Sequence, residues 1–263
     1  MKDNLAIAIQ ASLEAGKAIL EVYSSNDFNV EIKGDDSPLT RADKNANDVI
    51  NSYLTKTPIP IISEENRQLD YSERKDWSRC WIVDPLDGTK EFIKRNGEFT
   101  VNIALIENGN PVLGVIYVPV SKTLYFTSED ASKAYKISID DTLSIDAIFD
   151  NATEIRPQTE KQSVVKIVGS RSHLNDDTKL FISEIENKNQ VEIVSKGSSL
   201  KFCLVAEGEA NIYPRFAPTM EWDTAAGQAI CQAAGVKVID NNTKKPLQYN
   251  KENLLNPYFL VSI

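Results

Sequence analysis

The sequence contains few of the residues on which several common kinds of protein site depend. Its 263 residues include 1 histidine, which excludes a phosphohistidine-type site built from several histidines. Its 3 cysteines, Cys80, Cys203 and Cys231, are odd in number and lie far apart within apolar stretches. We therefore expect buried, reduced thiols, and neither a disulfide framework nor a zinc site.

Positive charge and long apolar runs are scarce as well. The chain has 29 basic and 38 acidic residues, a net charge of -9, which argues against a broad surface for a nucleic-acid polymer. No apolar run approaches the roughly 18–20 residues of a membrane-spanning helix, and residues 1–4 do not begin a secretory signal. We expect a cytoplasmic protein without an integral membrane segment. Peripheral association with the inner membrane is compatible with this expectation.

The rest of the composition, 41% hydrophobic and 25% charged, is typical of a globular protein that buries a large core. A long first helix is predicted by apolar positions at helical spacing, namely Leu5, Ile9, Leu13, Gly16, Leu20 and Tyr23. Thr40 and Asp43 form a Thr-x-x-Asp start signal for a second helix. The core face of that helix reads Ala42, Ala46, Val49, Ile50 and Tyr53.

Further elements divide the chain into two parts. In the first part we expect strands at 28–32, 59–62, 80–83, 99–106, 112–118, 123–127 and 135–139. In the second part strands at 164–169, 191–194, 210–213 and 236–239 alternate with helices at 176–186, 198–207 and 223–234. The polar stretch 138–162 between them has no clear period. The sequence thus predicts an α+β part, residues 1–150, with an antiparallel sheet, and an α/β part, residues 151–263.

Acidic residues follow two of the short apolar strands. Glu64 and Glu65 come after the strand at 59–62, and Asp84 and Asp87 come after the strand at 80–83. Because open sheets place their ligand crevices at strand ends, we expect these side chains to converge. Two charges ~4 Å apart repel by ~4 kcal/mol even at an effective dielectric constant near 20. Such a cluster needs cations, and hard oxygen ligands suit Mg²⁺.

Each acidic residue also has an ordinary structural interpretation. Asp84-Pro85 and Asp87-Gly88 are typical of turns, and Glu64 and Glu65 could be solvated loop residues. Asp43 could close a capping box with Thr40, and Asp223 could be the acidic residue expected at a helix N-terminus. Taken singly, none of these residues indicates a function.

Taken together, they lie in motifs that resemble those of the inositol monophosphatase superfamily. Residues 81–89 (WIVDPLDGT) resemble its signature, residues 63–65 (SEE) lie upstream as that family requires, and residues 221–227 (EWDTAAG) match its C-terminal Trp-Asp motif. The resemblance covers essentially the whole chain and is weakest between about 133 and 162. It implies a layered α-β-α-β-α sandwich of the sugar phosphatase type, present as a monomer or a homodimer, and inhibition by Li⁺.

The resemblance also implies a set of metal ligands and catalytic residues. Two Mg²⁺ ions would be held by Glu64, Asp84, Asp87, Asp223 and the backbone carbonyl of Leu86, with room for a more weakly bound third. Glu65 would orient ligands or water. Gly88 and Thr89 would present backbone N–H groups to the phosphate. A water activated by Mg²⁺ and positioned by Thr89, itself hydrogen-bonded to Asp43, would attack phosphorus in line.

Within the superfamily the sequence resembles bacterial 3′(2′),5′-bisphosphate nucleotidases of sulfate assimilation, notably over 84–118 and 196–215. That likeness assigns substrate contacts to His173, Ser198, Lys201 and Arg215. Ser198 and Lys201 would be one helical turn apart near a helix N-terminus, where they suit a second anion. Without the resemblance, His173 reads as a loop histidine and the others as solvated side chains. Asn211 stands where the family usually carries Asp, and we expect little consequence.

The predicted activity is hydrolysis of adenosine 3′(2′),5′-bisphosphate to AMP, and of 3′-phosphoadenylyl sulfate to adenylyl sulfate. One alternative is an inositol or sugar phosphatase, in which an acidic residue shortly before the Trp-Asp motif binds sugar hydroxyls. Here that region is Arg215-Phe216-Ala217-Pro218, with no acid until Glu221. A different alternative is a non-catalytic nucleotide- or metal-binding module. Degeneration should first remove metal ligands, all of which are present.

Overall fold

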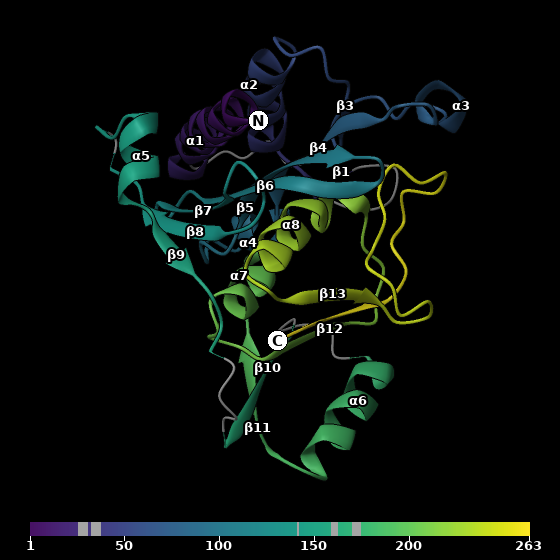
Figure 1. The fold of residues 1–263 in the computed structure, drawn as a ribbon. Helices are drawn as coiled ribbons and strands as arrows, with labels where there is room; N and C mark the ends of the chain where they lie inside the picture. The colour runs from purple at the N-terminus through teal and green to yellow at the C-terminus, as the bar shows by residue number, and fades with distance from the viewer. Residues whose placement is uncertain (26–30, 33–37, 141, 159–162, 170–174) are drawn as a thin grey trace.

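The protein is a stack of five layers, helices alternating with sheets, as Figure 1 shows. The structure is a computed structural model, and it describes residues 1–25, 31–32, 38–140, 142–158, 163–169 and 175–263. From one outer layer to the other, the order is α1 and α2, a seven-stranded sheet, α7 and α8, a five-stranded sheet, and α6. This arrangement confirms the layered α-β-α-β-α sandwich.

The larger sheet has the strand order β3-β4-β5-β6-β7-β8-β9. Its strands are β3 (Ile61–Ser63), β4 (Arg79–Asp87), β5 (Thr100–Glu107), β6 (Asn110–Val118), β7 (Thr123–Thr127), β8 (Ala134–Ser138) and β9 (Thr153–Ile155). The predicted hairpin of β5 and β6 is confirmed, with Asn108 and Gly109 at the turn. The sheet is antiparallel except at one edge, where β3 and β4 run parallel. That one parallel pair departs from the expected antiparallel sheet.

One face of this sheet is covered by α1 (Lys2–Ser24) and α2 (Arg41–Leu54), which pack against each other and on β4, β5 and β6. Both helices bury most of the apolar positions expected from helical spacing, and Leu5, Ile9, Ala46 and Ile50 are inaccessible to solvent or nearly so. Leu20, Tyr23, Val49 and Tyr53 are half-buried. The predicted capping box is present, because Thr40 and Asp43 satisfy each other's backbone amides at the start of α2.

The opposite face of the sheet is covered by α8 (Ala225–Ala233), with α7 (Leu200–Ala206) beside it. A Cβ atom at Gly114 of β6 would lie 2.5 Å from the backbone oxygen of Ala226, so only glycine permits this close packing. With helices on both faces, β4 and β5 are buried along almost their whole length, which explains their continuous apolar sequences.

The smaller sheet has the order β11-β10-β12-β14-β13. Its strands are β10 (Val164–Gly169), β11 (Gln190–Ser195), β12 (Ile212–Arg215), β13 (Lys237–Asp240) and β14 (Phe259–Ser262). β10 runs parallel to β11 and β12, and β14 pairs antiparallel with both β12 and β13. Helix α6 (Asp176–Glu186) packs on β11 on the outside. The sequence pattern did not predict β14.

Several element bounds differ from those expected. The polar stretch holds α5 (Ile145–Asn151) and β9, which pairs with β8, so the larger sheet extends to residue 155. The last predicted helix is split into a 3₁₀ turn, η1 (Glu221–Asp223), and α8. The remaining short elements are β1 (Glu31–Ile32), β2 (Pro38–Leu39), α3 (Tyr71–Arg74) and α4 (Thr89–Ile93). Residues 28–30 of the strand expected at 28–32 lie outside the described residues.

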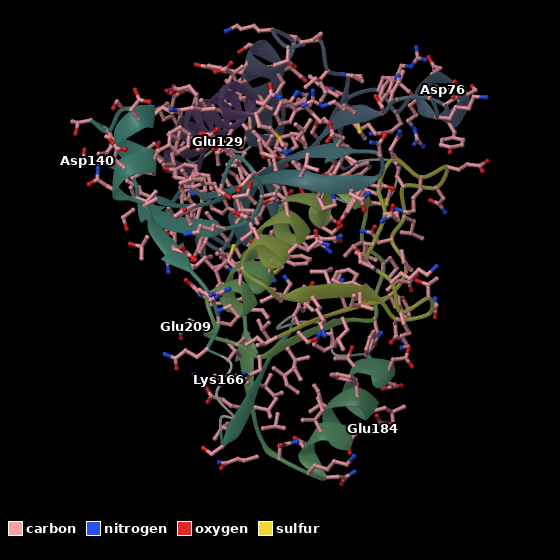
Figure 2. The ribbon with its side chains drawn as sticks, in the orientation of Figure 1. Asp76, Glu129, Asp140, Lys166, Glu184 and Glu209 are labelled. Atoms are coloured by element: carbon pink, nitrogen blue, oxygen red, sulfur yellow. The ribbon has the colours of Figure 1, made fainter. Side chains whose placement is uncertain are left out.

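The excess negative charge is dispersed over the surface. The exposed acids Asp76, Glu129, Asp140, Glu184 and Glu209 lie at separate places around the molecule in Figure 2. The three cysteines are buried and free, as expected. Within the described part of the chain, no helix combines the length and apolar character needed to cross a bilayer.

Candidate active site

The parallel pairing of β3 and β4 brings acidic residues together at one end of the larger sheet. Ser63 lies opposite Val83, and the backbone N–H of Glu64 donates to the carbonyl of Val83 at 3.1 Å. Glu64 directly follows β3, and Asp84 lies beside it in β4. The two residues therefore converge, as predicted. Glu65 follows in the same loop and is half-buried.

A bulge in β4 turns Asp84 and Asp87 to the same side of the sheet. The expected turn after residue 83 is wrong, because the strand continues to Asp87. Asp84 lies opposite Asn102 and Asp87 opposite Thr100, so three steps along β4 match two along β5. In a regular strand, residues three apart face opposite sides, and the extra residue of the bulge corrects this.

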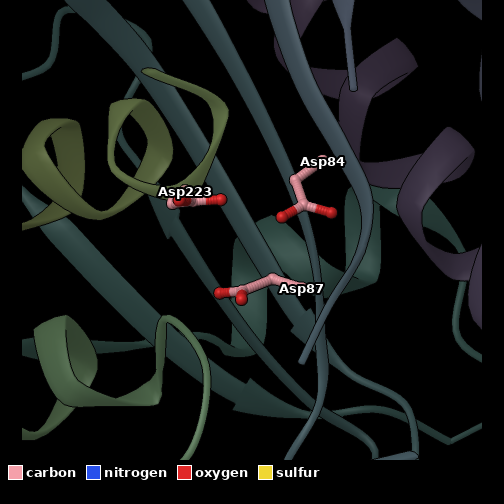
Figure 3. A group of neighbouring side chains, drawn as sticks. All are labelled: Asp84, Asp87 and Asp223. Carbon is pink, nitrogen blue, oxygen red and sulfur yellow. The ribbon is translucent and has the colours of Figure 1, made fainter. Parts of the chain in front are cut away.

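Asp223 joins this pair from the other side of the cleft. It is the last residue of η1 and not the first residue of a long helix, and one of its oxygens accepts the Met220 N–H at 2.8 Å. One carboxylate oxygen from each of Asp84, Asp87 and Asp223 lies within 4.8 Å of the other two. Figure 3 shows the three side chains pointing into a common space between the strand and η1.

Ionisation of these clustered carboxylates is unfavourable in the protein alone. Burial, followed by the charges of Glu64, Asp87, Asp223 and Asp43, raises the pKa of Asp84 well above its usual range. Burial and the neighbouring Asp87 raise the pKa of Asp223 to about 8. Buried, converging carboxylates of this kind are stable when hard cations neutralise them, so the donor set fits Mg²⁺.

Asp43 serves two contacts at once. One oxygen, Oδ2, accepts the N–H and the hydroxyl of Thr40 at 2.7 and 2.6 Å, which closes the capping box. The other oxygen, Oδ1, accepts the hydroxyl of Thr89 at 3.1 Å. The structural and the functional interpretations of Asp43 are therefore compatible, and the capping box fixes the oxygen that faces Thr89.

The segment after β4 begins a short helix. Gly88 has φ of 94°, in the region that favours glycine, and α4 starts at Thr89. The Leu86 carbonyl lies 3.4 Å from the Thr89 hydroxyl, and the Leu86 N–H donates to Asp84 at 3.0 Å. Gly88, Thr89 and Leu86 thus surround the carboxylates, as expected from the motif.

A cavity of about 360 Å³ opens beside the carboxylates, between α4 and the segment that leads into α7. Its lining includes Asp87, Gly88 and Asp223 together with Ser198, Lys201 and Arg215. Residues predicted from separate motifs therefore share one cavity. His173 lies outside the described residues.

Lys201 and Arg215 are the cationic residues of the cavity that the sequence predicted, and Lys201 is buried. Its ammonium group donates to the Ser198 carbonyl at 2.5 Å and lies 5.6 Å from the centre of the Tyr213 ring. Burial lowers the pKa of Lys201 to about 8. The prediction that Ser198 belongs to this helix is wrong, because α7 begins at Leu200 and Ser198 has φ of 44°.

Two polar atoms of residues that line the cavity lack a hydrogen-bond partner among the described residues. They are the buried Ser198 Oγ and the buried Arg215 Nε. Arg215 ends β12, and its Nη2 donates to the Pro218 carbonyl at 2.9 Å, which fixes the guanidinium group. Orphaned donors beside a buried lysine are what an anionic ligand would satisfy. Asn211, in contrast, accepts the Lys166 N–H at 2.7 Å and joins β12 to β10.

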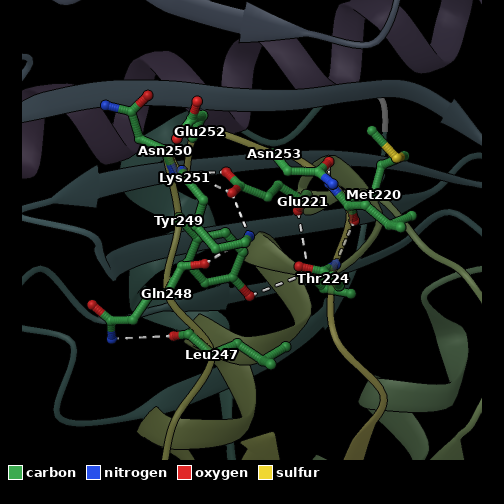
Figure 4. Close-up of polar contacts among 12 residues, drawn as sticks. Met220, Glu221, Thr224, Leu247, Gln248, Tyr249, Asn250, Lys251, Glu252 and Asn253 are labelled. Carbon is green, nitrogen blue, oxygen red and sulfur yellow. Dashed lines mark hydrogen bonds and ion pairs between the residues drawn. The ribbon is translucent and has the colours of Figure 1, made fainter. Parts of the chain in front are cut away.

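The sequence reasoning missed the network that fixes η1, which Figure 4 shows. Glu221 is fully buried, and its carboxylate accepts the backbone N–H groups of Asn250 and Lys251 at 2.6 and 3.0 Å and the Lys251 ammonium at 2.5 Å. The Tyr249 hydroxyl, from the same segment, donates to the Gln228 side-chain oxygen at 2.9 Å and lies 3.2 Å from the Thr224 hydroxyl. These contacts hold the turn that carries Asp223. An acid directly before the Trp-Asp pair was the available signal.

Comparison with known proteins places these features in context. The sequence profile of the inositol monophosphatase family matches residues 1–258. The 3′(2′),5′-bisphosphate nucleotidase CysQ of Salmonella typhimurium is 47% identical over 257 residues, 97% of this chain and 97% of the relative. The crystal structure of CysQ from Bacteroides thetaiotaomicron, a bacterial member of the inositol monophosphatase family, superposes with a TM-score of 0.89 at 50% identity, covering 99% and 97% of the two chains. The Thermotoga maritima IMPase is 24% identical and shares the fold, with a TM-score of 0.73 over 99% of this chain and 92% of that one.

Proposed function

Since the chain belongs to the inositol monophosphatase family, we propose that it is a magnesium-dependent 3′(2′),5′-bisphosphate nucleotidase. It would release phosphate from adenosine 3′(2′),5′-bisphosphate to give AMP, and from 3′-phosphoadenylyl sulfate to give adenylyl sulfate, in sulfate assimilation. The observation that carries this proposal is a single cavity that is lined both by the carboxylates and by the cationic side chains of Lys201 and Arg215. Such a cavity suits a substrate with a reacting phosphate and a second anion.

The metal ligands that we propose are Glu64, Asp84, Asp87, Asp223 and the carbonyl oxygen of Leu86. Four carboxylates balance two Mg²⁺ ions, and the charge of a substrate phosphate leaves room for a third ion. Bound Mg²⁺ supplies charge neutralisation, a lower pKa for water and polarisation of the phosphoryl group. Glu65, next to Glu64 in the loop, would orient a ligand or a water.

Thr89 and Asp43 position the attacking water. The Thr89 hydroxyl proton points to Asp43, so a lone pair of the Thr89 oxygen is left to accept a hydrogen bond from that water. The water is thereby turned with its oxygen toward phosphorus. The backbone N–H groups of Gly88 and Thr89 would bind the phosphoryl oxygens, which keeps the phosphorus in line.

The non-reacting 5′-phosphate would bind the cationic residues that line the same cavity. Lys201 and Arg215 supply positive charge, and the Ser198 hydroxyl is a donor without a partner among the described residues. His173 is assigned to the nucleotide by the resemblance alone. Because the proposed metal ligands and the cationic residues are different side chains, specificity and catalysis are assigned to different residues.

The inositol or sugar phosphatase alternative is disfavoured by the environment of Glu221. This acid is the nearest one before the Trp-Asp pair, and its oxygens are already engaged by Asn250 and Lys251 in the interior. It is therefore not free to accept hydrogen bonds from a polyol. A non-catalytic binding module would have no use for the Thr89–Asp43 hydrogen bond that orients a water.

Three buried, free thiols also support a place in a reducing compartment, the cytoplasm. An oxidising compartment would favour disulfides, and none of the three is paired.

Phosphate release from a substrate panel tests the proposal. The protein with Mg²⁺ is expected to hydrolyse adenosine 3′,5′-bisphosphate with a kcat/KM at least about tenfold above that for adenosine 3′-monophosphate, and far above that for inositol 1-phosphate. A second anion bound by a charge-assisted hydrogen bond accounts for a factor of this size. EDTA should abolish turnover, and added Mg²⁺ should restore it. Preference for the polyol phosphate, or no release from any substrate, would refute the proposal.

A further inference from the structure

The hydroxyl of Ser199 connects the two sides of the carboxylate cluster. Ser199 Oγ lies 2.6 Å from Asp87 Oδ2, on the bulged strand, and 3.1 Å from the backbone carbonyl of Asp223, in η1. Asn102 Nδ2, from the neighbouring strand β5, lies 2.8 Å from the same hydroxyl. Ser199 is 1% exposed, so water does not compete for these contacts.

Chemistry and distance together fix the direction of the chain of hydrogen bonds. The Asn102 amide nitrogen can only donate, so the Ser199 oxygen is the acceptor in that contact. The Asp87 carboxylate and the Asp223 carbonyl can both only accept, and the single Ser199 proton points to Asp87, whose oxygen is charged and nearer. A donor that is itself polarised by an upstream donor binds a carboxylate more strongly than an isolated hydroxyl does. One oxygen of Asp87 is thus held in place.

We infer that Ser199 is a positioning residue for the cation site, which it shapes by orienting Asp87. This inference rests on the proposed function for the identity of the cation. Metal ligands need a fixed orientation, and loss of such an outer hydrogen bond typically costs about 10- to 100-fold in metal affinity. No cation ligand is removed when Ser199 is replaced, so the site is loosened and not abolished.

Ser199 is also close in sequence to the residues that we assign to substrate binding. It lies next to Ser198 and two positions before Lys201. Gly197, which precedes Ser198, contacts the loop before β5, because its N–H donates to Glu98 at 2.9 Å. A Cβ atom at Gly197 would lie 2.7 Å from Glu91 Cγ and 2.9 Å from the Glu98 carbonyl oxygen. The segment is therefore packed closely against its neighbours, which supports the Ser199 contact with Asp87.

Titration of the substrate-free, full-length protein with Mg²⁺ by calorimetry tests the inference. The Ser199→Ala variant should bind Mg²⁺ about 10- to 100-fold more weakly than the wild type. Its kcat at saturating Mg²⁺ should recover to within a few-fold of wild type, while the Mg²⁺ concentration for half-maximal rate rises by the same factor as the dissociation constant. Ser12→Ala is the matched control, because Ser12 is a fully buried serine in α1 that bonds to the Ile9 carbonyl, on the other side of the sheet. It should leave Mg²⁺ affinity unchanged.

A second variant keeps the test decisive if the alanine variant does not fold. Ser199→Cys retains the volume but replaces a strong donor by a weak one, and it should also weaken Mg²⁺ binding. Wild-type Mg²⁺ affinity in either folded variant would overturn the inference. If the wild type binds Mg²⁺ but does not hydrolyse the bisphosphate, the proposed function falls while these affinities still decide the role of Ser199.

Discussion

Burial of Lys201 lowers its pKa to about 8, so this side chain loses its charge within the pH range of ordinary assays. Asp87, Glu91 and Asp223 favour the charged form, and Arg215 opposes it. The 5′-phosphate needs the charged form, so above pH 8 binding must be accompanied by uptake of a proton. We expect KM for adenosine 3′,5′-bisphosphate to rise about tenfold per pH unit above pH 8, since each unit removes about nine-tenths of the remaining charged form.

Two controls separate this effect from titration at the cation site. KM for adenosine 3′-monophosphate, which lacks the second anion, should stay level over the same range. A Lys201→Arg variant remains charged at high pH and should flatten the profile for the bisphosphate. Parallel pH profiles for both substrates would place the titrating group elsewhere.

Asp84 shows how one residue can oppose folding and serve the site. It is 1% exposed and surrounded by Glu64, Asp87 and Asp223. Asp84→Asn removes one of these charges, and the amide oxygen can still accept the Leu86 N–H that Asp84 accepts now. We expect turnover to fall by at least about a thousandfold, because an essential cation ligand contributes several kcal/mol. In EDTA the thermal midpoint of the variant should exceed that of the wild type.

In saturating Mg²⁺ the order of the two midpoints should reverse, since the wild type then gains the stabilisation of bound cation. Differential scanning calorimetry under both conditions measures the pair. A variant that melts below the wild type in EDTA, or that keeps activity within tenfold, would contradict the assignment of Asp84.

At the scale of elements, the bulge in β4 separates what the sequence could predict from what it could not. The apolar runs before Glu64 and Asp84 predicted two strands whose ends converge, and both are present. Asp-Pro and Asp-Gly are equally typical of turns, however, and the bulge depends on the register with Thr100 and Asn102 of β5. A register is a property of two strands, so the sequence of one strand cannot reveal it.

The elements that the sequence missed have the same explanation. β9 and β14 are 3 and 4 residues long, too short for an alternating pattern to be distinctive. β14 is a strand because it lies between β12 and β13, and β9 because it pairs with β8. Likewise, nothing in Gly197-Ser198-Ser199 indicates which serine faces Asp87. Motifs identified the residues of the site, while pairing between distant segments decides their contacts.

The segment that holds η1 provides a test at this scale. Lys251→Met removes the ammonium group from Glu221 and leaves a buried carboxylate with two backbone N–H partners. We expect the variant to lose about 1–3 kcal/mol of unfolding free energy, the usual effect of removing a partner from a buried charged group. Urea unfolding monitored by circular dichroism measures the loss.

The double variant Glu221→Gln/Lys251→Met removes the buried charge as well and should recover much of the stability. Recovery would show that the unpaired carboxylate, and not a change in packing at residue 251, caused the loss. A double variant less stable than Lys251→Met would contradict this account of η1.

On the scale of the whole molecule, the residues of the proposed cation site come from different layers of the fold. Asp84 and Asp87 lie on the larger sheet, while Asp223 lies in the turn before α8, which packs between the two sheets. Mg²⁺ bound at the proposed site would therefore stabilise the packing of these layers as well as the local carboxylates. At Mg²⁺ concentrations about 100 times the dissociation constant, the stabilisation is about 2.7 kcal/mol.

That stabilisation corresponds to a rise of about 5–10 °C in the thermal midpoint for a chain of this size. Scanning calorimetry in EDTA and in Mg²⁺ measures it, with Na⁺ at equal ionic strength as the control. An equal rise with Na⁺ would indicate general screening and not a specific site.

The position of β14 determines when the site becomes usable as the chain is made. β14 lies between β12 and β13. Its Phe259 is buried against Phe202 and Tyr213, which line the cavity. Synthesis proceeds from the N-terminus, so the larger sheet can be complete long before residue 259 leaves the ribosome. Until then β12, with Arg215, has one edge unpaired. The nascent protein can thus hold a finished carboxylate-bearing sheet while the pocket that selects its substrate is still unformed.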